Sequence, residues 1–167
     1  NLIITIGREY GTGGREIGQK LALRLGVPFY DRELITRAAK KTGFDEKLFE
    51  QLDKRATNSF LYSLTMFGSV GLNGMSLTDQ LYLAQSNIIR EMAEDSSCVI
   101  VGRCADHVLR DFPNKFDFFI HGSIEDRVKR VQTCGDYVIE GKTPEAALEK
   151  MDKQRSTYYN YYTGKVW

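Results

Sequence analysis

The feature that most constrains the fold is a glycine-rich segment near the N-terminus, which reads GREYGTGGRE over residues 7–16. It follows an apolar, β-type run over residues 2–6 and precedes a helical pattern formed by Ile17, Leu21 and Leu25. A glycine loop between a strand and a helix places backbone N–H groups at a helix N-terminus, where an anion can bind. Glycine suits such a loop because wrapping a phosphate requires positive φ angles and close approach of the backbone. We therefore interpret the segment as a phosphate-binding loop, which indicates a nucleotide-dependent enzyme.

The loop departs from the P-loop pattern G-x-x-x-x-G-K-[ST], because no Lys-Ser or Lys-Thr follows its glycines. If Gly13 is the second glycine of the pattern, Gly14 stands where lysine belongs. If Gly14 is that glycine, Arg15 stands there and Glu9 replaces the first glycine. Arg15 or Arg8 could supply the missing charge, since arginine binds phosphate in a bidentate way.

The candidate ligands of the donor phosphates are therefore residues of the loop itself: Arg8, Gly11, Thr12, Gly13, Gly14 and Arg15. The hydroxyl that binds magnesium in the standard motif would come from Thr12, from water or from elsewhere. A glycine-rich turn without a ligand stays open as the alternative. A dinucleotide-binding fingerprint is disfavoured, because residues 11–16 lack its third glycine and no acidic residue follows at the expected interval.

Composition indicates one ordinary globular domain over residues 1–167, with 42% hydrophobic and 27% charged residues. The net charge of +1 gives no sign of a nucleic-acid-binding surface. Three cysteines without metal-type spacing favour reduced thiols and a cytoplasmic location. No signal peptide or membrane-spanning run is recognisable, so we expect no membrane partner. Both ends of the sequence look trimmed, and a further strand could follow residue 167.

Strands alternate with helices, which predicts an α/β, P-loop-like three-layer fold with a parallel sheet and helices on both faces. The predicted strands lie at 2–6, 27–30, 98–101 and 116–120. The predicted helices lie at 15–25, 31–41, 45–54, 78–94, 105–110, 123–132 and 143–162. Expected N-caps are Thr78 or Asp79, Ser123 and Thr143. We interpret residues 57–77 as irregular or mobile, and the helix over 78–94 could contribute to a homo-oligomer.

Ligands of such folds bind at the carboxyl ends of the strands, where several charged residues should meet. These are Asp31 and Arg37 after the second strand, and Arg103 after the third. A plain helix cap for Asp31, a solvated helix face for Arg37 and a surface ion pair for Arg103 are the alternatives. Further along the chain, Arg127 and Arg130 share a helical face and could close over transferring phosphates, although a solvated face is equally open.

Four tyrosines close the last predicted helix, at positions 158, 159, 161 and 162. We favour packing as their role, with stacking on a base as the alternative. His107 and His121 have no partner motif and are interpreted as structural.

Together, these motifs resemble the cytidylate-kinase-like family of P-loop kinases over nearly the whole chain. The matching stretches are residues 7–17, 28–31, 101–103, 152–159 and 162–164. The resemblance implies a transferase that moves a phosphoryl group from ATP–Mg²⁺ to a small nucleotide, with (deoxy)cytidine monophosphate as the first candidate acceptor. It also implies a mobile acceptor-binding region over about 31–77 and a lid over about 127–160.

The resemblance further implies individual roles. Acceptor binding falls to five residues: Asp31, Arg37, Arg103, Asp152 and Arg155. Charge stabilisation during transfer falls to four: Arg15, Arg127, Arg130 and Arg155. The chain departs from true cytidylate kinases where Arg32-Glu33 replace Ser-Gly and where Cys104, Leu148 and His121 replace Asp, Arg and Asp. A kinase for another small acceptor and a non-catalytic nucleotide-binding module are therefore the competing hypotheses.

Overall fold

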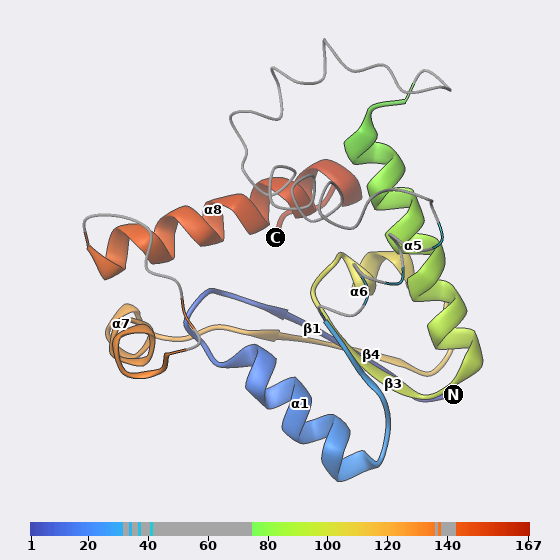
Figure 1. Cartoon of the computed structure of the whole chain (residues 1–167), viewed down its shortest axis with the longest axis horizontal. Coiled ribbons are helices and arrows are strands. Elements are labelled where there is room, and N and C mark those ends of the chain that lie inside the picture. Colours follow the sequence, from blue (N-terminus) through green and yellow to red (C-terminus); the bar gives the residue numbers. More distant parts are fainter. Residues whose placement is uncertain (32–33, 35–36, 38–40, 42–74, 136, 138–142) are drawn as a thin grey trace.

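A computed structural model describes residues 1–31, 34, 37, 41, 75–135, 137 and 143–167. Its centre is a four-stranded, all-parallel sheet in the order β2-β3-β1-β4 (Figure 1). The strands are β1 (Ile3–Arg8), β2 (Phe29–Tyr30), β3 (Cys98–Val101) and β4 (Lys115–Ile120). The predicted parallel sheet is confirmed. The predicted helices over 31–41 and 45–54 and the irregular segment over 57–77 fall largely outside the described residues.

The two central strands are buried on both faces, as a parallel sheet covered by helices requires. On one face, alternate residues of β1 and β3 pack with helix α1 (Gly14–Leu25). On the other face, the intervening residues pack with α5 (Leu77–Asp95) and α6 (Ala105–Val108). The expectation of helices on both faces is thus confirmed (Figure 1).

Helix α1 turns a different side toward the sheet from the one its large apolar residues suggest. Ile17 and Leu25 are 43% and 44% exposed, whereas Gly14, Gly18 and Ala22 are buried. A Cβ at Gly18 would lie 2.8 Å from Val101 Cγ2, so no larger residue fits this contact without a shift. Small residues therefore bring the start of α1, and with it the glycine loop, close to the sheet.

Local caps fix where the remaining long helices begin. Ser123 accepts the Asp126 N–H at the start of α7 (Ile124–Thr133), and Thr143 accepts the Ala146 N–H at the start of α8 (Pro144–Thr163), as predicted. The predicted N-cap of α5, Thr78 or Asp79, is wrong by two or three residues. Its N-cap is Ser76, whose hydroxyl accepts the Asp79 N–H at 3.1 Å.

Helix α8 runs from α7 to the beginning of α5, across the side of the sheet that α5 and α6 occupy (Figure 1). The Tyr159 hydroxyl donates to Asp106 of α6 at 2.6 Å, and the Tyr162 hydroxyl donates to the Thr78 carbonyl at 3.2 Å. The Tyr162 ring stacks on Tyr82 with centroids 3.9 Å apart. Tyr159 and Tyr162 therefore make the packing contacts that the sequence favoured for this cluster. None of the described helices is long and apolar enough to cross a membrane.

Candidate active site

The glycine loop connects β1 to α1 at the carboxyl end of the sheet. Gly11 and Gly13 have φ angles of 82° and 76°, in the left-handed region that glycine adopts without strain. Gly13 is the N-cap of α1 and has no side chain to cap it, so the first amides of the helix are open to an outside acceptor. This is the geometry that an anion requires at a helix N-terminus.

One of these amides already has an acceptor. The Gly13 N–H donates to the Tyr137 hydroxyl at 3.2 Å, and the Tyr137 ring packs edge-on against Tyr10 with centroids 5.3 Å apart. Arg130 also donates to this hydroxyl, which together with nearby Glu16 raises the pKa of the Arg130 guanidinium. The Tyr137 hydroxyl oxygen thus accepts hydrogen bonds from a backbone amide and from a guanidinium. A phosphate oxygen would accept from the same two kinds of donor.

Arg130 lies directly over the loop. A Cβ at Gly13 would be 2.6 Å from the Arg130 guanidinium carbon, so only glycine at this position lets the arginine approach so closely. Arg130 also forms an ion pair with Glu16 on α1. Arg130 thus lies beside the glycine loop, and its contact with transferring phosphates stays a prediction. Tyr137 was not among the residues singled out from the sequence.

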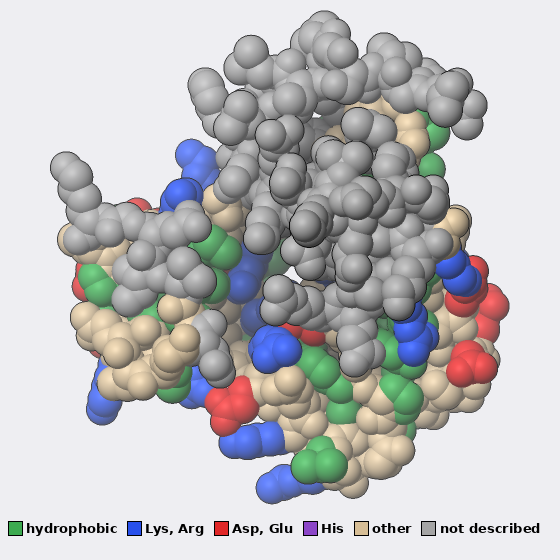
Figure 2. Space-filling view, in the orientation of Figure 1, with side chains coloured by type: hydrophobic (Ala, Val, Ile, Leu, Met, Phe, Trp, Pro, Cys, Tyr) green, Lys and Arg blue, Asp and Glu red, His purple; other side chains and the backbone are tan. Residues whose placement is uncertain are grey.

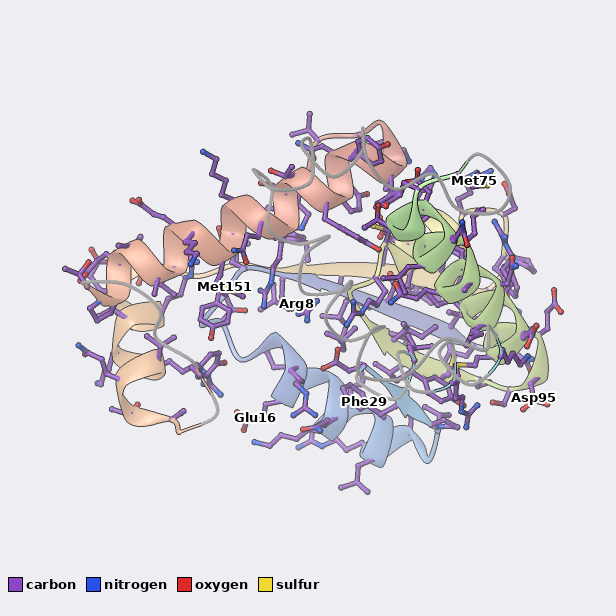
Figure 3. The ribbon with its side chains drawn as sticks, turned by 45° about the horizontal axis from the view of Figure 1, so that its top comes forward. Arg8, Glu16, Phe29, Met75, Asp95 and Met151 are labelled. Carbon is purple, nitrogen blue, oxygen red and sulfur yellow. The ribbon has the colours of Figure 1, made fainter. Side chains whose placement is uncertain are left out.

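Four arginines, here called the arginine cluster, meet near the carboxyl ends of β1 and β3: Arg8, Arg15, Arg103 and Arg155. Arg155 donates from Nη1 to the Arg8 carbonyl at 3.0 Å, and its guanidinium lies 5.1 Å from the Tyr10 ring centroid. Figure 3 shows Arg8 between α8 and α1. In Figure 2, Lys and Arg side chains gather in the middle of the face, between the α7 end of the molecule and the rest.

The charges of this cluster are only partly compensated. Burial, followed by the repulsion from Arg155, lowers the pKa of Arg8 to about 9, and Asp31 opposes the change. Burial likewise lowers the pKa of Arg155, against the attraction of Asp152. Asp31 accepts a hydrogen bond from Arg15 Nε at 2.8 Å. Guanidinium groups whose charged form is disfavoured by burial and by neighbouring arginines are suited to an incoming anion.

The backbone around Arg103 has an unusual conformation. Gly102, Arg103 and Cys104 follow β3 with φ angles of 76°, 61° and 53°. Left-handed residues other than glycine cost about 1–2 kcal/mol each, and such strain is concentrated at functional sites. Of the other predicted acceptor residues, Arg37 lies with its guanidinium carbon 5.5 Å from the centroid of the Tyr30 ring.

Arg127 and Asp152, which were predicted to act on substrate, form an ion pair with each other. Arg127 is 6% exposed, donates from Nε to the Tyr10 carbonyl at 2.7 Å, and pairs with Asp152 and, at 3.3 Å, with Glu9. Asp152 in turn accepts the Tyr10 N–H at 2.7 Å. The pair therefore ties α7 and α8 to the glycine loop, and any contact with substrate stays a prediction.

The loop fits phosphate groups better than it fits a protein-held metal ion. The Thr12 hydroxyl donates to the Glu9 carbonyl at 2.9 Å, and Arg15 follows Gly14 where the standard motif has Ser or Thr. No group of three or more His, Cys, Asp or Glu residues placed to hold a metal ion occurs within the described part of the chain. A magnesium ion here would depend mainly on nucleotide phosphates and water, as Mg²⁺ commonly does.

The sequence profile of the cytidylate kinase-like family matches residues 3–167. The chain belongs to the cytidylate kinase-like family. This confirms the resemblance drawn from the sequence motifs, and with the parallel sheet and glycine loop it makes the chain a P-loop kinase-like protein. A comparison with curated proteins gave no match.

Two solved structures illustrate the likeness. An uncharacterized protein from Eubacterium ventriosum is 32% identical, with a TM-score of 0.66, over 100% of this chain and 81% of its own. A shikimate kinase from Bacteroides thetaiotaomicron is 16% identical, with a TM-score of 0.54, over 95% of this chain and 82% of its own. At that identity the second likeness shows the shared fold.

Proposed function

We propose that this kinase-like protein transfers the terminal phosphoryl group of ATP to a small anionic acceptor, with CMP and dCMP as the first acceptors to test. The observation that carries the proposal is the arginine cluster beside the open amides of the glycine loop. Together they offer donors for two sets of phosphate oxygens, one on the donor nucleotide and one on the acceptor.

Phosphoryl transfer requires little covalent chemistry from the protein, since positioning and charge stabilisation provide most of the catalysis. In the proposed arrangement, the loop amides and Arg130 hold the donor phosphates, while Arg103 and Arg37 hold the acceptor's anionic group. Asp31 orients the acceptor, and Arg155 and Arg15 offset charge that develops between the two substrates. A magnesium ion carried by ATP would further neutralise the donor phosphates.

An acceptor other than a cytidine nucleotide is the second candidate. Cys104 occupies the position where the family resemblance leads us to expect an aspartate, and it is 4% exposed. Burial raises the pKa of its thiol to about 12, so it cannot replace a carboxylate at neutral pH. Leu148, at an expected arginine position, is fully buried against Tyr10 and Val131. Two contacts implied for cytidylate are thus replaced by core residues.

The test is ADP formation from ATP and Mg²⁺ with CMP, dCMP, UMP, AMP and GMP, each offered separately. Arg103→Gln should lower kcat/KM for the accepted nucleotide by about 100-fold or more, without lowering the melting temperature. Arg110→Gln is the control, because Arg110 is an exposed arginine on the same segment. Turnover of a different acceptor class would retain the kinase and remove the cytidine assignment. ATP binding without transfer to any acceptor would favour a nucleotide-binding module.

A further inference from the structure

We propose that Arg8 replaces the P-loop lysine, because arginine and glycine have exchanged places at two positions of the loop. The pattern G-x-x-x-x-G-K spans seven residues. When its second glycine is set on Gly13, its first glycine falls on Arg8 and its lysine falls on Gly14. The positive charge has thus moved to the first position of the motif, and the glycine has moved to the last. The phosphate-binding role of this charge rests on the proposed function.

The two exchanged positions are in contact, which makes the exchange a matched one. A Cβ at Gly14 would lie 2.7 Å from Arg8 Cβ and 3.0 Å from Arg8 Cγ. The stem of Arg8 therefore fills the space into which any side chain at position 14 would project. A lysine at position 14 would clash with Arg8, and Arg8 in its observed position requires glycine at position 14.

A second glycine makes room for the other end of the same side chain. A Cβ at Gly102, after β3, would overlap Arg8 Nη1. Gly102 has a φ of 76° and donates its N–H to the Ile6 carbonyl at 3.0 Å, so its backbone is held against the end of β1. Glycines from two separate segments therefore leave space for one arginine, whose guanidinium is directed along the carboxyl ends of β1 and β3.

Arg15, the other candidate for the missing charge, is placed differently. Its side chain is 53% exposed, and its Nε–H is donated to Asp31 at 2.8 Å. Arg8 is half-buried in the arginine cluster and has Arg155 and Arg103 as close charged neighbours. A guanidinium there can donate to two phosphate oxygens at once, whereas a lysine ammonium acts as a point charge. The charge that replaces the lysine is therefore assigned to Arg8.

The experiment restores the standard order by exchanging the two residues back. Three variants are compared with the wild type: Arg8→Gly, Gly14→Lys and the double variant. Binding of ATP and of pyrophosphate is measured by calorimetry, and the melting temperature is measured without ligand. Arg8→Gly should weaken binding of both ligands about 10- to 100-fold. Gly14→Lys alone should lower the melting temperature, and the double variant should recover both the melting temperature and most of the affinity.

Two control variants and the melting temperatures distinguish a failure of this inference from a failure of the proposed function. Arg24→Ala, which removes an exposed arginine at the end of α1, should leave binding unchanged. Arg15→Gln should weaken pyrophosphate binding less than Arg8→Gly does. If Arg8→Gly bound ATP and pyrophosphate with wild-type affinity, this inference alone would be overturned. The same would follow if Gly14→Lys lowered the melting temperature equally in the wild type and in Arg8→Gly. Wild-type protein that binds neither ATP nor pyrophosphate would overturn the proposed function together with the phosphate role of Arg8.

Discussion

Two arginines flank the same stretch of the glycine loop and meet opposite surroundings. Arg127 is buried among Asp152, Glu9 and the Tyr10 carbonyl, so its charge is matched within the protein. Arg8 lies beside Arg155, Arg103 and Arg15, with Asp31 as the opposing carboxylate. The first arrangement holds the loop in place, whereas the second leaves positive charge for a ligand. Both arginines are near the loop, so nearness does not distinguish their roles. The number of carboxylates that pair with each arginine does.

The comparison predicts that Arg127 matters most for stability. Arg127→Ala would remove the buried partner of Asp152 and Glu9 and the donor to the Tyr10 carbonyl, and breaking a buried ion pair costs about 3–5 kcal/mol. We expect a loss of that order in the free energy of unfolding, measured by urea denaturation. Lys129→Ala, an exposed neighbour on α7, should cost under about 0.5 kcal/mol. If Arg127→Ala had the same free energy of unfolding as the wild type, Arg127 would not be needed to hold the glycine loop, and the structural role assigned to it would be wrong.

The binding side of the comparison predicts a pH dependence. Burial and the neighbouring arginines lower the pKa of Arg8 to about 9, and a bound phosphate would raise it again. Below pH 8, both free and bound protein keep the proton, so the contribution of Arg8 to pyrophosphate affinity, measured as the ratio of wild-type to Arg8→Gln affinity, should be constant. As pH rises through about 9, the free protein loses a proton that the complex retains, and this ratio should fall by up to about tenfold per pH unit.

Calorimetric titrations with pyrophosphate between pH 7 and pH 10 measure this dependence, with the melting temperature followed at each pH to show that the fold persists. Arg8→Gln removes the titrating group of the protein, so its weaker binding reports the titration of pyrophosphate itself and serves as the reference. A ratio that stays level through pH 10 would show that binding is not linked to loss of the Arg8 proton in this range.

Much of this fold was predictable because its signals are local in the sequence. The glycine loop, the buried strands and the caps at Ser123 and Thr143 each depend on residues within a few positions of one another. Ser76 was missed because Thr78 and Asp79 are equally good capping residues, and only the observed hydrogen bond distinguishes them. The buried face of α1 was missed because its small residues carry little hydrophobic signal, yet they alone allow the observed close packing.

The site was predictable in its residue types and much less in its pairings. Arg127 and Asp152 were both singled out, but their ion pair joins two helices across a separation of 25 residues. Nothing in the sequence indicated that one would neutralise the other. Gly13 and Tyr137 lie 124 positions apart, and their contact depends on how α7 and α8 lie against the loop. Contacts of this kind follow from tertiary packing, which motif spacing does not encode.

The hydrogen bond between Gly13 and Tyr137 gives the smallest of the predicted effects. The Tyr137 hydroxyl accepts the Gly13 N–H that the proposed function assigns to a donor phosphate, so ATP must displace it. Tyr137→Phe removes the hydroxyl and keeps the ring that packs on Tyr10. A neutral hydrogen bond is worth about 0.5–1.5 kcal/mol, so ATP should bind about 2- to 10-fold more tightly, as measured by calorimetry. Tyr161→Phe, on the exposed side of α8, is the matched control and should leave the affinity unchanged. Weaker binding in Tyr137→Phe would mean that the hydroxyl contacts bound ATP instead of competing with it, and would place Tyr137 with Arg8 on the ligand-binding side of the loop.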